Sequence, residues 1–238
     1  MAPPPGYVAY GGQNHSSYGT FQAIKGTSKA LGIVMIVVIA TQVASMLASV
    51  AYRGRVADFV NGNLTSDDIN GVLGIVGTIG LISAGSTLGA AVLTMIWMFR
   101  MAKNQQVLGR VGTWVPGWAI GGWFVPPCVL YVIPYLMMRD LWKGSDPDSG
   151  PNWKQNKIAP VVHVWWVLFG LIPLLFVSVT INNAKFGAGK SIDETARNLD
   201  DSFTTQLLQG AVQVAAAAAF LMLVRQLSAR HMRVTNES

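Results

Sequence analysis

Charged side chains are scarce in this 238-residue chain: Asp, Glu, Lys and Arg make up 12%, roughly half of their share in soluble domains. The charged residues are unevenly distributed along the chain. No charge at all occurs in the stretches 30–52, 71–99, 111–138 and 203–224. The stretch 158–182 is interrupted only by a histidine. An apolar run of about 18 residues or more is typical of a membrane span. The composition therefore excludes a soluble globular enzyme, a secreted disulfide scaffold and an intrinsically disordered chain.

Cysteine and catalytic motifs are scarce as well. Cys128 stands alone, so the chain forms no internal disulfide and no cysteine-based metal site. Histidine pairs at helical spacing, phosphate-binding glycine loops and a serine nucleophile elbow are all missing. No acidic or basic residue lies deep in an apolar stretch, which disfavours ion pumps and ion-coupled transporters. We therefore expect no cofactor, no metal, no enzymatic activity and, without a basic cluster that includes aromatics, no nucleic-acid partner.

The two ends of the chain are predicted to lie outside the membrane domain. Residues 1–27 are rich in Pro, Gly, Tyr and Ser and offer few aliphatic side chains to bury, so they predict a disordered tail. The first apolar run follows Lys25 and Lys29 without a cleavable signal peptide, and we expect it to act as an uncleaved anchor. A single helical membrane domain is predicted over 28–228, followed by a tail over 229–238.

The positions of Lys and Arg predict how the five apolar segments are threaded. If all five cross with the N-terminus inside, eight of the 17 basic residues lie inside and nine outside. If 111–138 enters and leaves by the same face, twelve lie inside and five outside. Cytoplasmic loops collect Lys and Arg, so the second count is favoured. The expected fold is an all-α integral membrane protein with both termini cytoplasmic and four spans, at about 30–52, 72–100, 160–182 and 203–225.

The segment 111–139 predicts a re-entrant or interfacial helical hairpin between the second and third spans. The adjacent prolines Pro126 and Pro127 break a helix interior, and the helical pieces expected around them, 117–125 and 128–138, each measure about half a bilayer. A full span kinked by proline is the alternative, which the charge count disfavours. Several aromatic residues suit an interfacial position: Trp114, Trp118, Trp123, Tyr131, Tyr135 and Trp142.

Smaller patterns concern the loops and the contacts between spans. Ser191 and Glu194 are spaced as a capping box, which predicts a short helix before the last span. The second span repeats glycine at positions 71, 74, 77 and 80 and again at 85 and 89; we expect these to pack within the bundle, with a dimer seam as the alternative. Gln206, Gln209 and Gln213 share one helix face, and with Gln42 they predict hydrogen bonds across helices or, alternatively, a polar pathway.

One dense motif occupies residues 97–166. Its prolines would bend the hairpin, its tryptophans would anchor it, and its few polar residues would tie its ends together, with Arg100 and Asn104 one turn apart on one helix face. The motif residues are Trp97, Arg100, Asn104, Pro116, Trp118, Trp123, Pro126, Pro127, Pro134, Tyr135, Arg139, Asp140, Trp142, Asp146, Trp165 and Trp166. The segment that holds Asp146 is also predicted to be a turn, at Ser145-Asp146-Pro147.

This string, together with Leu108-Gly109, resembles the membrane protein family called domain of unknown function 4328, which is found mainly in actinobacteria. The resemblance implies a multi-pass bacterial plasma-membrane protein and implies no particular activity. One departure is that residues 128–133 carry no Asn, whereas family members often have one between the corresponding prolines.

Three functions are weighed on this basis. The first is a non-enzymatic accessory or scaffold protein that acts through protein or lipid partners: a membrane protein, a second copy of the chain, or anionic lipids at the cytoplasmic face. The alternative is a transporter or channel for a small solute or lipid that uses the hairpin 111–139 as a gate. The third, an enzyme acting on lipid head groups, would need Asp140, Asp146, Asp148 or His163 to converge, and it ranks last.

Overall fold

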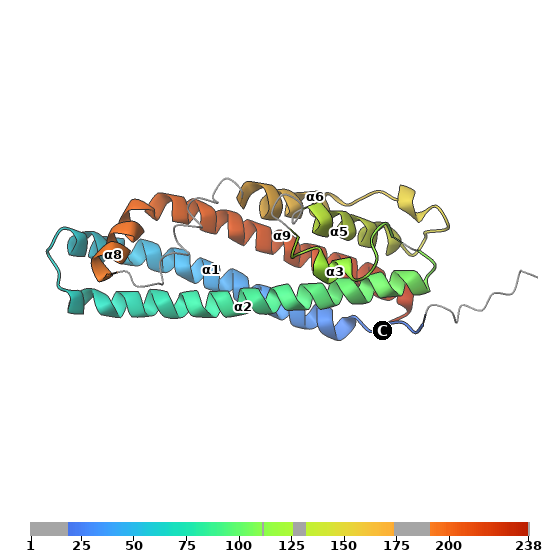
Figure 1. Cartoon of the computed structure of the whole chain (residues 1–238), viewed down its shortest axis with the longest axis horizontal. Coiled ribbons are helices and arrows are strands. Elements are labelled where there is room, and N and C mark those ends of the chain that lie inside the picture. Colours follow the sequence, from blue (N-terminus) through green and yellow to red (C-terminus); the bar gives the residue numbers. More distant parts are fainter. Residues whose placement is uncertain (1–18, 111, 126–131, 174–190, 238) are drawn as a thin grey trace, which may run out of the picture.

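The computed structural model describes residues 19–237 except 111, 126–131 and 174–190. The described residues form helices and no β-strand. Helices α1 (Lys25–Val60) and α2 (Ser66–Val107) run antiparallel as one long hairpin, and α9 (Phe203–Thr235) lies along α1 (Figure 1). These three helices are long and apolar enough to cross a bilayer. An all-helical protein with membrane-length apolar helices is therefore confirmed.

Shorter elements pack beside this frame. The helix α3 (Trp118–Gly121) and the helix α5 (Val132–Gly144) follow α2, and the short 3-10 helix η2 (Trp153–Gln155) comes next. The helix α6 (Pro160–Trp166) continues as the π-helix η3 (Val167–Leu171) and packs against α9. Together α6 and η3 form a shorter apolar helix, Pro160–Leu171. The second half of the predicted span 160–182 lies outside the described residues.

The far end of the bundle, which we define as the turn 61–65 with α8 (Ile192–Asp201), is more helical than expected. The predicted spans 30–52 and 72–100 would leave a loop over 53–71, but α1 continues to Val60 and α2 begins at Ser66. The reason is a small apolar core, in which Val56 and Phe59 of α1 pack with Ile69 and with Ala196 of α8. These apolar residues have helical spacing but stand among polar residues, so the sequence pattern did not predict a helix there.

The helix α8 itself confirms the predicted capping box. The Ser191 Oγ accepts the Glu194 N–H at 3.2 Å, and the Glu194 carboxylate accepts the Ser191 N–H at 3.4 Å. Each contact satisfies an N–H that a helix start otherwise leaves without a partner.

The terminal end of the bundle, which we define as residues 19–28, 97–110, 144–149 and 228–237, contains chain-end segments that are more ordered than predicted. The disordered-tail prediction is wrong for residues 19–27, since α1 begins at Lys25 and Gln22 and Ile24 form hydrogen bonds. The predicted tail 229–238 is helical through Thr235, where α9 ends. The rest of the N-terminal tail, residues 1–18, lies outside the described residues.

The main hydrophobic core lies in the half of the bundle next to the terminal end. Leu31, Trp97, Met98 and Leu223 are among the completely buried side chains that form it. Trp142 also belongs to this core and is only 5% exposed, so it packs inside the protein, while its interfacial depth in the membrane stays a prediction. It lies under the guanidinium of Arg230, which explains why a large aromatic side chain is covered there.

The predicted hairpin is present in part. The first helical piece, expected over 117–125, is only the four-residue α3, while the second begins at Val132 and runs on to Gly144. Pro134 lies in the first turn of α5, where a missing N–H costs no helical hydrogen bond. Pro126 and Pro127 lie outside the described residues.

Most of the α2 glycines do not pack against the described residues, contrary to the prediction that they pack within the bundle. A Cβ added at position 71, 74, 77, 80 or 85 would meet nothing within 4 Å in the described part of the chain. Gly89 differs, since its added Cβ would lie 3.8 Å from Val34 of α1. Of these glycines, Gly89 is therefore the one that lies against α1 among the described residues.

Candidate functional site

Asn104, near the end of α2, binds the peptide group of Gln22. Its Oδ1 accepts the Gln22 N–H at 2.7 Å, and its Nδ2 donates to the Gln22 carbonyl at 2.9 Å. One turn earlier on the same face, Arg100 donates to the Ala23 carbonyl at 2.9 Å. Asn104 is completely buried. The predicted shared face of Arg100 and Asn104 is thus confirmed, and its role is to hold the N-terminal segment.

The second Asn104 N–H contacts His231 of α9. The distance from Asn104 Nδ2 to His231 Nε2 is 3.1 Å, and because an amide nitrogen only donates, Nε2 must be the acceptor. The proton of the neutral ring is then on Nδ1, which donates to Ser145 Oγ at 2.8 Å. Ser145 and His231 are completely buried. The chain Gln22–Asn104–His231–Ser145 therefore joins the N-terminal segment, α2, α9 and the loop after α5.

This arrangement keeps His231 neutral and argues against a catalytic role. His231 lies beyond the predicted span 203–225, and its burial lowers its pKa from 6.5 to about 4, with Glu237 opposing the shift and Arg110 adding to it. A protonated ring would also place an N–H against the Asn104 amide. Because Nδ1 already donates to Ser145, the ring offers no lone pair to take the Ser145 proton, as a general base must. Ser145, His231 and Asn104 therefore resemble a Ser–His–Asn triad only in their residue types.

The loop after α5 is held by Arg110. Its Nη1 donates to the Gly144 and Asp146 carbonyls at 2.8 and 2.9 Å, and its Nη2 donates to the Ser149 carbonyl at 2.8 Å. Within the loop, the Asp146 carboxylate accepts the Asp148 N–H at 3.2 Å, which confirms the predicted turn. Burial lowers the pKa of Arg110, and the charge of Asp146 opposes that shift.

Helix α9 is joined to the same loop and to α2. The Trp97 Nε1 donates to Ser228 Oγ at 3.0 Å. The Arg230 Nη2 lies 3.0 Å from Asp146 Oδ2, and its guanidinium lies 4.9 Å from the centre of the Trp142 ring. Three residues of the predicted motif thus contact this last helix.

The C-terminal residues cap the first helix. The Glu237 carboxylate accepts the Ile24 N–H at 2.9 Å and the Lys25 N–H at 2.8 Å. These are N–H groups that a helix start leaves without a partner, and the negative charge suits the positive end of the helix dipole. The first and last described residues of the bundle therefore meet at the terminal end.

The predicted motif separates into two groups in the structure. The first gathers at the terminal end or on the adjoining α5 and comprises Trp97, Arg100, Asn104, Arg139, Asp140, Trp142 and Asp146. Asp140 accepts the Thr113 N–H at 3.1 Å, and Arg139 lies 4.0 Å from it.

The second group forms aromatic contacts around α6. Tyr135 stacks on Trp166 with ring centroids 4.5 Å apart, and its hydroxyl lies 3.0 Å from His163 Nδ1. Trp165 stacks on Phe169 at 5.6 Å, and Trp123 meets the same ring edge-on.

Pro116, in the turn before α3, is buried, and Trp118 meets Trp114 edge-on at 5.6 Å. Asp140 and Asp146, two of the acidic residues that a head-group enzyme would need, have different partners, and no three His, Cys, Asp or Glu side chains gather among the described residues as a metal site requires.

Four residues of the terminal end were missed from the sequence: Arg110, Ser145, His231 and Glu237. Their partners lie far away along the chain, 127 residues for the pair Asn104–His231, so no local spacing reveals them. Among these four residues, the sequence distinguishes only Glu237, which is the single acidic residue after Asp201.

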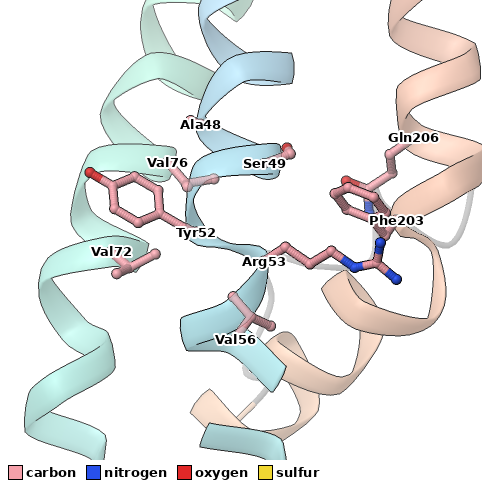
Figure 2. A pocket seen from close by; sticks show the side chains of 9 residues that line it. All are labelled: Ala48, Ser49, Tyr52, Arg53, Val56, Val72, Val76, Phe203 and Gln206. Carbon is pink, nitrogen blue, oxygen red and sulfur yellow. The ribbon is translucent and has the colours of Figure 1, made fainter. Parts of the chain in front are cut away.

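A cleft separates α1 from α9 in the half of the bundle next to the far end. Figure 2 shows its outer part, where Arg53 extends from α1 toward Phe203 and Gln206 of α9. The Arg53 guanidinium lies 4.2 Å from the centre of the Phe203 ring. The outer part is lined by Ala48, Ser49, Tyr52, Arg53, Val56, Val72, Val76, Phe203 and Gln206.

The inner part of the cleft is a cavity of about 210 Å³. Its described lining residues come from α1 and α9: Gln42, Ser45, Met46, Ser49, Gln206, Leu207, Gln209, Gly210 and Gln213. All four glutamines singled out from the sequence therefore meet at one cavity. The expected hydrogen bond across helices is present for Gln42, which donates to Ser83 of α2 at 3.2 Å.

The described part of the chain thus defines an all-helical protein with three apolar helices of membrane length, a hydrogen-bonded terminal end and a polar cleft. The chain belongs to the family described as Domain of unknown function (DUF4328), whose family model matches residues 60–229. No curated protein and no solved structure matches the chain. The match includes Asn104 and Ser145 but excludes Gln22, His231 and nearly all of α1, so both candidate sites combine family and non-family segments.

Proposed function

We propose that the chain is a non-enzymatic accessory or scaffold protein of a bacterial plasma membrane that acts through a partner within the bilayer. In this proposal it has four spans and cytoplasmic termini. The bias of twelve basic residues against five supports this threading, and the apolar helix Pro160–Leu171 would begin the third span. The segment 111–139 is then a re-entrant or interfacial hairpin on the cytoplasmic side.

The observation that carries the proposal is an uncovered stripe of small residues on α2, which we name the α2 seam. It consists of Gly77, Gly80, Ala84, Thr87 and Ala91, all exposed. The spacing of seven between Gly77, Ala84 and Ala91 keeps them on one face of a helix that winds around a neighbour. Large apolar side chains border the seam, with Leu81 exposed by 77% and Leu88 by 69%.

Small residues matter more in a membrane than in water. Lipid tails are as apolar as leucine, so helices associate where small side chains let their backbones approach closely. A Cβ added at Gly77 or Gly80 meets nothing within 4 Å, so this chain does not use the seam for its own described helices. The chemistry of the seam therefore suits another membrane-spanning helix, from a second copy or from a different membrane protein.

The test compares two matched glycine variants in native membranes. Gly80→Leu fills the seam, whereas Gly85→Leu adds the same side chain about 140° around the helix, at a position that is equally open. We expect Gly80→Leu to lower the yield of partner recovered in mild detergent by about tenfold, equivalent to ~1.4 kcal/mol. Gly85→Leu should recover as much partner as the wild type.

Quantitative mass spectrometry of tagged chain from the native host gives the readout. Co-purification of two differently tagged copies identifies a second copy as the partner, and enrichment of another membrane protein identifies a heterologous one. Recovery of the bare wild-type chain, or equal losses for both variants, would overturn the proposal.

Anionic lipids are the second partner that the proposal includes. Exposed basic side chains surround the terminal end at Lys25, Lys29, Lys103, Arg225 and Arg233. Each basic residue near an anionic membrane surface contributes about 1 kcal/mol of attraction.

The alternative function, transport with the hairpin as a gate, has less support. Ala119 of α3 is completely buried, and a Cβ at Gly122 would lie 2.6 Å from Ile133 of α5, so the described hairpin is tightly packed where these two residues lie. A gate needs room to move, and that room exists at the α1–α9 cleft instead.

A further inference from the structure

The cavity between α1 and α9 combines a polar lining with a position deep in the predicted membrane. Gln42 lies near the middle of the predicted span 30–52, and Gln213 lies near the middle of 203–225. Six of the nine lining residues are Gln or Ser, which is unusual for two apolar helices at this depth. The inference below requires only that α1 and α9 cross the bilayer and does not depend on a protein partner at the α2 seam.

The lining has more hydrogen-bonding capacity than the described chain uses. A glutamine amide offers two donors and an acceptor with two lone pairs. Gln42 uses one donor on Ser83, Gln206 uses one on Ser202, and Gln213 has no side-chain hydrogen bond to the described residues. Hydrocarbon supplies no partner, and an unsatisfied polar group there costs several kcal/mol. The cavity therefore requires an occupant that forms hydrogen bonds.

The occupant should be uncharged. None of the nine described residues that line the cavity carries a charge, so they offer no counter-charge to an ion in a medium of low dielectric constant. An apolar occupant would leave the amides unpaired. The volume of about 210 Å³ is far larger than a single water requires, so a small organic molecule fits.

The cavity adjoins the outer part of the cleft. Ser49 and Gln206 line both the cavity and the outer part shown in Figure 2, so the two lie side by side. Ser49 lies one turn of α1 before Arg53, whose guanidinium rests against Phe203.

We propose that this cavity is a binding site for a small uncharged polyol, whose hydroxyls exchange hydrogen bonds with the amides of Gln42 and Gln213 and with Ser45. Hydroxyl groups both donate and accept, which matches the mixed amide and hydroxyl lining. The polyol is either a free solute or the polyol head group of a membrane lipid, because both present the same chemistry.

The test measures whether polyols protect a cysteine placed in the cavity. Ser45→Cys is nearly isosteric and is made in the full chain with Cys128→Ser, reconstituted in phosphatidylcholine nanodiscs. Its rate of modification by a small methanethiosulfonate reagent is followed with increasing glycerol or myo-inositol. We expect saturable slowing, about tenfold when the polyol is at ten times its Kd.

Two controls separate binding from general effects of polyols. Ser28→Cys lies at the terminal end, outside the cavity, and its rate should not change. Adding Gln213→Leu to Ser45→Cys keeps the side-chain size but removes an amide, and it should raise the polyol concentration needed for protection at least severalfold. Protection by phosphatidylglycerol or phosphatidylinositol nanodiscs without added polyol would identify a lipid head group as the source.

Three outcomes overturn the proposal. They are no protection by any soluble or lipid polyol, equal slowing at Ser28→Cys, and failure of the reagent to reach Ser45→Cys at all. The first means that the cavity holds water only, and the last means that it is filled by protein. If a polyol protects Ser45→Cys while the pull-down recovers the chain without a partner, the polyol site stands and the proposed partner function fails.

Discussion

The terminal end and the half of the bundle next to the far end use the same helices in opposite ways. At the terminal end, Asn104, Ser145 and His231 are completely buried and hydrogen-bonded to one another or to the backbone. In the other half, α2 exposes glycines with nothing near them and α1 leaves a polar cavity against α9. The terminal end therefore fixes the helices relative to one another, while the other half leaves surface for lipids, partners or ligands.

This difference has a simple cause in side-chain size. Large residues such as Trp97, Met98 and Trp165 fill the space between helices near the terminal end. The first half of α2 instead has glycine at positions 71, 74, 77, 80 and 85, where an added Cβ would meet nothing within 4 Å in the described chain. The comparison predicts that substitutions of similar chemistry have unequal effects in the two halves.

The largest effect is expected from Asn104→Leu. The substitution removes both contacts with Gln22 and the donor to His231, which leaves two part-buried backbone groups and one buried ring nitrogen unpaired. We expect the free energy of unfolding to fall by about 3 kcal/mol or more. Equilibrium unfolding by dodecyl sulfate in mixed micelles measures it. Gln106→Leu is the control, because that half-buried side chain has no hydrogen bond to the described residues, and a similar loss there would show that the network is not the cause.

A comparable effect is expected from acid. His231 has a pKa of about 4 when folded and 6.5 when unfolded, so the unfolded chain binds more protons between these values. Stability therefore falls as the pH is lowered from 7 to 4, by up to ~3 kcal/mol, and this contribution changes little below pH 4. The measurement is unfolding across this range. The variant His231→Gln should be less stable than the wild type at pH 7, and its stability should depend less on pH. Equal slopes of stability against pH for the two proteins would contradict the assignment of the acid effect to His231.

A smaller effect separates two glycines. In Gly122→Ala the new Cβ would meet Ile133 Cγ2 at 2.6 Å and the Trp118 carbonyl at 2.7 Å, and we expect a loss of about 2 kcal/mol. Gly74→Ala in the open half meets nothing within 4 Å, and there we expect no loss of stability. Unfolding of both variants in the same micelles tests the contrast directly. Equal destabilisation would mean that the α2 face is packed in solution.

Much of the fold could be predicted from the sequence because membrane physics acts on composition. The uncharged stretches 30–52, 71–99 and 203–224 lie inside the three long helices, since backbone groups in lipid must bond within their own helix. The extensions of these helices were missed. Their apolar residues, such as Val56 and Phe59, are few and stand among polar ones, so only the contact with Ile69 and Ala196 makes them a core.

The candidate sites were predictable to unequal degrees. The pattern of polar residues in an apolar helix identified Gln206, Gln209 and Gln213, because such residues are costly in lipid wherever they occur. The network at His231 depends on three-dimensional contacts between residues that are distant in the chain. A histidine followed by a basic helix end has no local feature that identifies Asn104 and Ser145 as its partners.

The contact between Asn104 and Gln22 has a consequence for how this segment can vary. Asn104 binds the N–H and the carbonyl of Gln22, whose side chain is exposed and takes no part. Position 22 should therefore accept almost any amino acid with equal stability, apart from proline, which has no N–H to donate. The segment can change its surface chemistry freely while its path across the bundle stays the same, so relatives could present different N-terminal residues from one preserved attachment point.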